Sequence, residues 1–191
     1  MGNRRVGRKR LYGVEKKGQK VVLAPGDGMS AAIARTTQHR QGQEMITEIL
    51  VDLGTSAGDL KAGGTSKIVG IGTSNDAYIT QLTEAKYGII TEIRAVVLES
   101  IKDSSDTAVD VDLITSDNSD LQAGNATVLC DGLSTKGTDI TAVDTDFHAN
   151  MQDSTPAYLY IANGAGDSNT NSLDAGKLAI YIHGFEAPSD L

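Results

Sequence analysis

The sequence predicts an all-β protein, an antiparallel β-sandwich in the form of a jelly roll of about eight strands with one or two short helices. Short segments of strand character recur along the chain, and turns rich in Gly, Asp, Asn and Ser separate them. Strands do not alternate with long helices, as a doubly wound parallel sheet would require. An immunoglobulin-like sandwich is the alternative, although one Cys and no Trp do not fit antibody-type domains.

The first elements are short. Residues 21–23 (VVL) predict a strand because they are β-branched or apolar. The Pro25-Gly-Asp-Gly turn then opens a marginal helix at 29–37, which is followed by a polar linker at 37–43. Residues 45–53 alternate apolar and polar side chains and therefore predict a longer strand.

The longest expected strand covers residues 87–100, YGIITEIRAVVLES. Before it we expect a Gly-rich loop at 54–66, a brief strand at 67–71 and, at 75–86, a short helix or an edge strand. On the long strand Glu92 and Arg94 are expected to face water. Its expected core-facing residues are Tyr87, Ile89, Thr91, Ile93, Ala95 and Val97.

A Lys-Asp-Ser-Ser-Asp turn is expected to join the long strand to a third one at 107–115 as a hairpin. Val109, Val111 and Leu113 would face inward there, and Asp110 and Asp112 outward. Both patterns place one strand face in the core and the other in water. The remaining expected strands cover 126–130, 139–143, 157–162 and 177–185.

Composition limits the possible classes of protein. A chain of 191 residues predicts one domain at 21–191 after a basic arm at 1–20. Only eight residues are aromatic, so the core must be aliphatic, and we expect association to supplement its stability. The lone Cys130 excludes an internal disulfide. Without a membrane-length apolar run or a signal-peptide core, we expect no membrane partner and synthesis in the cytoplasm.

Charge is divided unevenly between the arm and the rest of the chain. Residues 1–20 carry eight basic residues and one acidic residue, whereas the remainder carries 9 basic and 24 acidic residues. A flexible basic arm on an acidic body is suited to binding a negative partner, either an acidic protein surface or nucleic acid. The expected partner-binding residues are Arg4, Arg5, Arg8, Lys9, Arg10, Lys16, Lys17 and Lys20.

Catalytic motifs are weak, and we expect neither an enzyme, nor a cofactor, nor a small-molecule substrate. His39, His148 and His183 have no metal-ligand spacing. Cys130 with His148 is a conceivable nucleophile and base without an orienting third group.

Acidic segments offer the other candidate chemistry. Residues 167–174 place oxygen ligands two apart but lack the glycine and the final carboxylate of a calcium loop. A second group contains Asp110, Asp112, Asp117 and Asp120. A solvated acidic surface explains both segments, and divalent cations at subunit contacts are the open alternative; we expect no metal site.

Four segments carry a resemblance to a known family: AYLYIANGAG (157–166), DAGKLAIYIHGFE (174–186), NDAYITQLTEAKYGIITEIRAVVLE (75–99) and VDVDL (109–113). They resemble parts of small β-rich virion proteins of tailed phages, especially marine phages, in a pattern that covers roughly residues 40–187. The resemblance implies a capsid-associated decoration or cement protein, located in the virion, that forms a homotrimer and binds the major capsid protein. It provides no catalytic residues.

Two other roles stay open at this point. A jelly-roll coat protein that builds its own shell would use the basic arm to bind packaged genome. A tail- or fibre-associated module would bind host glycans in a cleft rich in aromatic side chains. The aromatic candidates for that cleft are Tyr158, Tyr160, Tyr181 and Phe185.

Overall fold

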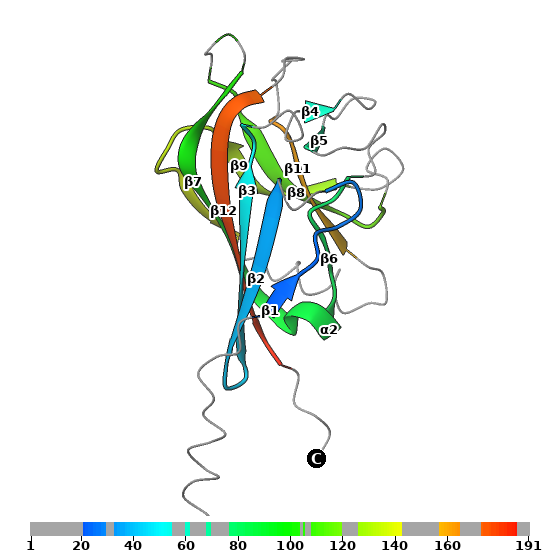
Figure 1. The fold of residues 1–191 in the computed structure, drawn as a ribbon. Helices are drawn as coiled ribbons and strands as arrows, with labels where there is room; N and C mark the ends of the chain where they lie inside the picture. The colour runs from blue at the N-terminus through cyan, green and yellow to red at the C-terminus, as the bar shows by residue number, and fades with distance from the viewer. Residues whose placement is uncertain are drawn as a thin grey trace, which may run out of the picture.

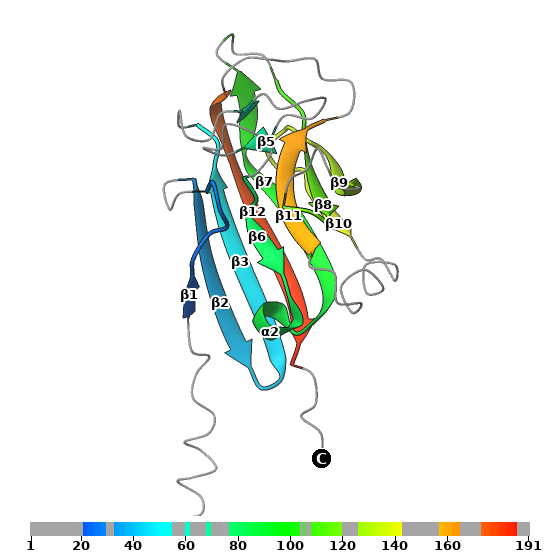
Figure 2. The same cartoon turned by 90° about the vertical axis from the view of Figure 1, so that its right-hand side faces the viewer.

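The computed structural model shows an all-β sandwich of two antiparallel sheets, as the sequence predicted (Figures 1 and 2). The part of the chain that it describes contains one helix, α2 (Glu84–Tyr87), and no helix long and apolar enough to cross a membrane. The described residues are 21–29, 33–54, 60–61, 68–69, 77–103, 105, 108–119, 126–142, 157–164 and 173–186.

The first sheet has six strands and contains the longest ones. β12 lies at its centre, between β3 and β7, and all of its strand pairings are antiparallel. In order across the sheet, the strands are β1 (Val21–Leu23), β2 (Ala34–Gln41), β3 (Glu44–Asp52), β12 (Leu173–Phe185), β7 (Ile89–Asp103) and β10 (Asp139–Ala142).

The second sheet is made of shorter strands and packs against the first (Figure 2). β6 pairs with the same strand, β11, as β5 does, beyond the end of the β5 pairing. In order, the strands are β4 (Leu60–Lys61), β5 (Ile68–Val69), β11 (Ala157–Asn163), β8 (Val111–Ser116) and β9 (Ala126–Leu133), with β6 (Thr80–Leu82) beside β11.

The main core lies between the sheets and is aliphatic, as expected from the composition. Tyr87 is its one aromatic side chain among the described residues. A smaller cluster lies on the other face of the second sheet, so β8 and β11 are buried on both faces. Its buried members are Ile68, Ala77, Ile114, Tyr160 and Ala162.

Two expectations about β8 are wrong: the facing of Asp112, because β8 is buried on both faces, and the hairpin with β7. Val109, Val111 and Leu113 are buried as predicted, but Asp112 is buried as well instead of facing water. The expected hairpin is reduced to a single bridge between Lys102 and Ala108. After that bridge the chain crosses to the other sheet, so β7 and β8 are not neighbours.

The expected helix at 29–37 and linker at 37–43 are also wrong where the structure describes them. Residues 34–41 form β2, which is joined to β3 by a tight hairpin at Gly42 and Gln43. The other expected strands correspond to β1, β3, β5, β9, β10, β11 and β12. The segment 75–86 contains both expected forms, the edge strand β6 and the helix α2.

β7 follows the predicted alternation only after its first residues. Ile93, Ala95 and Val97 are buried as expected, but Ile90 is buried and Thr91 exposed. The register with β12 shifts between His183 and Gly184, which is a β-bulge. Because a bulge inserts one residue, it inverts the facing of the residues before it.

Candidate functional site

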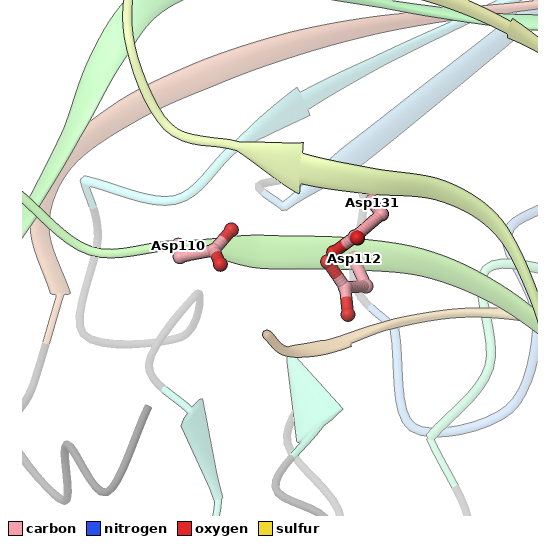
Figure 3. Close-up of side chains that lie close together, drawn as sticks. All are labelled: Asp110, Asp112 and Asp131. Carbon is pink, nitrogen blue, oxygen red and sulfur yellow. The ribbon is translucent and has the colours of Figure 1, made fainter. Parts of the chain in front are cut away.

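An acidic cluster forms where β8 begins and pairs with β9. Asp110 precedes β8, Asp112 lies on it, and Asp131 comes from β9 (Figure 3). One carboxylate oxygen of each residue lies within 4.8 Å of those of the other two. The sequence grouped Asp110 with Asp112 but did not include Asp131. Of the other two members of that predicted group, Asp117 is not in the cluster and Asp120 lies outside the described residues.

A β-bulge places Asp131 in this cluster. Val111 pairs with Leu133 and Leu113 with Cys130, so that Asp112 alone faces two residues of β9, Asp131 and Gly132. Gly132 has φ 77°, a left-handed conformation that glycine adopts most easily. Its N–H donates to Oδ1 of Asp112 at 3.0 Å. An Asp-Gly pair inside a strand is thus the sequence signal for the third carboxylate.

Asp112 is the buried member of the cluster. Its side chain is 3% exposed. Its pKa is raised from an ordinary value of 3.8 to about 6, chiefly by burial; the charges of Asp131 and Asp110 contribute to the rise, and the Gly132 N–H opposes it.

Close packing of Gly164 fixes Asp110 beside Asp112. The Gly164 N–H donates to the backbone oxygen of Asp110 at 3.0 Å. A methyl group at position 164 would collide with the Asp110 carboxylate, so the carboxylate rests against the glycine backbone. The end of β11 thus closes one side of the cluster.

Chemically, the cluster can do one of two things. Asp112 can share a proton with Asp131, which lowers the repulsion between them. Alternatively, the three carboxylates could hold a hard divalent cation through their oxygens. Neither arrangement includes a nucleophile or a base directed at a substrate.

The residues predicted to bind a partner, and several of the weaker candidates, lie outside the described residues. This applies to all eight basic residues of the arm, to His148 and to residues 167–172. His39 and His183 lie on β2 and β12 and pair with the same residue, Ile46 of β3.

Cys130 has the environment of a structural cysteine. It is fully buried, and its Sγ lies 3.6 Å from the backbone oxygen of Ile140. Burial raises the pKa of its thiol from 9.0 to about 11. A nucleophilic cysteine needs the opposite shift, so this geometry does not favour the Cys130 and His148 pair.

The four aromatic candidates for a glycan cleft are divided between the sheets. Tyr158 and Tyr160 lie on β11, whereas Tyr181 and Phe185 lie on β12. Tyr160 is fully buried, and its hydroxyl donates to the backbone oxygen of Asn118 at 2.7 Å. These residues therefore do not line one cleft.

Comparisons with protein-family models, with curated proteins and with solved structures find no match to this chain.

Proposed function

We propose that this chain is a non-enzymatic structural protein of a virion, a decoration or cement protein that binds to the shell of a phage head. The pairing of its eight principal strands carries the proposal. Two further features support it: the basic segment at 1–20 and the acidic remainder of the chain.

Numbered one to eight in chain order, the principal strands are β3, β5, β7, β8, β9, β10, β11 and β12. Strand one pairs with eight, two with seven, three with six and four with five. Apart from β1 and β2, which extend the first sheet beyond strand one, and β4 and β6 in the second sheet, the sheets read 1-8-3-6 and 2-7-4-5. A ribbon of four such antiparallel pairs wrapped around a core is a jelly roll, a fold that is frequent in capsid proteins. Since a fold alone does not determine function, the charge distribution must supply the mode of binding.

Electrostatics supports a role on the shell. The acidic remainder, with 24 acidic and 9 basic residues, repels other copies of itself and keeps the protein soluble. The basic segment can contact an acidic coat surface through Arg4, Arg5 and Arg8, among others. One exposed ion pair contributes little. Several linked segments in an oligomer act together through their effective concentration.

The alternative is a coat protein that assembles its own shell, because the same strand pairing is frequent in shell subunits. In that role the basic segment would face inward and neutralise the phosphates of packaged nucleic acid. The glycan-binding role is not carried forward, since its four aromatic candidates do not share a cleft.

Sedimentation of the full chain, followed at 260 and 280 nm, separates the two roles. A small oligomer without nucleic acid is the expected result, and large particles that carry nucleic acid would support the coat protein instead. Immunogold labelling of virions should then mark the heads. Labelled tails, or virions without label, would contradict both roles.

Variants of the basic segment test its role. Replacing Arg4, Arg5, Arg8, Lys9 and Arg10 with Gln should weaken attachment to purified heads most at low salt, and the difference from the unchanged protein should shrink as added salt screens the charges. The control replaces the four arginines with Lys, which keeps the charge, and should attach normally. If the Gln variant attaches as well as the unchanged protein at every salt concentration, the segment has no such role.

A further inference from the structure

The outer face of the first sheet is an exposed apolar surface with charged margins. Among the described residues no element covers it (Figure 1). Leu50 is 41% and Leu98 43% exposed. A hollow of about 270 Å³ lies beside them, with Arg35 and Lys177 also on its lining. β12 contributes Lys177 and Leu178 to its lining.

The strand register arranges this face in rows that cross the sheet. One row has a cation at one end, an anion at the other and apolar residues between them: Arg35, Leu50, Ala179, Val96 and Asp139. The next row places Glu48 and Arg94 on either side of Tyr181. In both rows the charge changes sign across β12.

We propose that this face binds a second copy of the chain, related by a two-fold axis parallel to β12. Such an axis reverses the order of strands, so each row faces itself in the opposite direction. Arg35 then lies opposite Asp139 of the second copy, and Leu50 opposite Val96 of the second copy. Glu48 likewise faces Arg94 of the second copy. Like charges in these two rows do not meet.

Arg94 already binds Asp139 within one chain. In the dimer this pair would gain Arg35 and Glu48 of the second copy as neighbours, giving a charge network of four residues. One row opposes the contact, because Lys177 would face its own copy and Asp52 would face Glu99 of the second copy. Within each chain the charge of Lys177 is offset by two carboxylates, since its Nζ lies 2.6 Å from Oε2 of Glu99 and 4.0 Å from Oδ2 of Asp52.

The face is large enough for a stable contact. Five strands about 4.8 Å apart, over the roughly 30 Å length of β3, give an area of about 700 Å². A standard protein interface buries about 800 Å² on each partner. Sheets that pack face to face keep their mean strand directions within about 30° of each other, and the parallel β12 strands of this arrangement fall within that range.

The two-fold arrangement has a consequence for the basic segments. Val21 pairs with Gln38, towards the end of β2 where the β2–β3 hairpin lies. β12 ends beside this hairpin, at Phe185 opposite Glu44 (Figure 1). With the axis parallel to β12, the segments 1–20 of both copies would be attached to the same end of the dimer. The dimer itself does not depend on the proposed virion role.

Sedimentation equilibrium of the full chain should give twice the chain mass of 20.0 kDa. Leu50→Glu with Leu98→Glu should weaken the dimer about tenfold or more. The matched control is Val128→Glu, which is 53% exposed on β9 of the other sheet and should leave the dimer unchanged. Thermal melting checks that each variant folds.

A charge exchange tests the symmetry directly. Arg35→Glu and Asp139→Lys should each weaken self-association, because like charges then meet across the axis. An equal mixture of the two variants should associate again, since both contacts between positions 35 and 139 in the mixed dimer join opposite charges. A mass of one or three chains, unaltered association of the Leu50 and Leu98 variant, or a mixture that stays monomeric would overturn the proposal. A three-chain mass would fit the trimer implied by the resemblance, and immunogold labelling tests the virion role separately.

Discussion

Replacing Asp112 with Asn should stabilise the protein at neutral pH and flatten its dependence on pH. Asp112 is buried beside Asp131 and Asp110, and its pKa is raised from 3.8 to about 6. In the unfolded chain its pKa returns to its ordinary value. Between pH 4 and 6 the folded state therefore binds more protons than the unfolded state, and stability falls as pH rises through this window.

The size of the effect follows from this shift. A change of about two pKa units corresponds to about 3 kcal/mol. We expect about 2 kcal/mol, because Asp131 is exposed and water reaches its side of the pair. The contribution is present in full below about pH 4 and is lost above about pH 6. The Asp112→Asn substitution removes the titrating group, while the amide oxygen that it introduces can still accept the Gly132 N–H.

Urea unfolding followed by circular dichroism at pH 4.5, 5.5, 6.5 and 7.5, with EDTA present, measures this effect. The variant should gain about 2 kcal/mol at pH 7.5, or roughly 4–8 °C in Tm, and little at pH 4.5. Asp174→Asn, an exposed carboxylate on β12, is the control and should change neither value. If Asp112→Asn lowers stability at pH 7.5, or leaves the pH slope intact, the assignment of a strained carboxyl pair is wrong.

Three more predictions concern packing. Gly184→Ala should cost about 3 kcal/mol or more in urea unfolding, because its methyl group would collide with the backbone oxygen of Tyr87; Gly132→Ala, which meets no atom, should cost only about 1 kcal/mol for its left-handed backbone. Tyr87→Phe should lower the free energy of unfolding by about 1–2 kcal/mol, since it removes the buried 2.7 Å hydrogen bond with the Thr80 hydroxyl. A Tm equal to that of the unchanged protein would contradict this prediction. Cys130 should react with a thiol reagent at pH 8 only after unfolding, and rapid labelling of the native protein would refute its burial.

The fold class could be predicted from the sequence because the long strands alternate apolar and polar side chains. β3 and most of β7 show this pattern, and their inward residues are buried as expected. β2 could not be recognised in the same way, because its inward side chains Thr36 and Gln38 are polar. Gln38 donates to the Thr47 hydroxyl at 3.1 Å and to the Lys86 backbone oxygen at 2.7 Å. A strand whose buried face is polar carries no hydrophobic period.

The facing of residues in the second sheet could not be predicted from alternation either, for the opposite reason. β8 and β11 are covered on both faces, so burial no longer alternates along them. Alternation predicted that Asp112 faces water, and the small cluster around Tyr160 and Ile114 shows why it does not. A sequence pattern reports the chemistry of a side chain, whereas burial depends on what covers the sheet.

The acidic cluster shows how far local sequence can locate a site. Asp110 and Asp112 are two residues apart on one extended segment, so their proximity follows from strand geometry alone. Asp131 joins them only because β9 is the neighbour of β8 and because Gly132 allows a bulge at that register. Without the bulge, the two-residue period would be unbroken, and the Gly132 N–H could not reach Asp112 together with the Asp131 carboxylate. The pairing of strands therefore determines which carboxylates lie beside the buried Asp112, and this burial and proximity give the site its predicted sensitivity to pH.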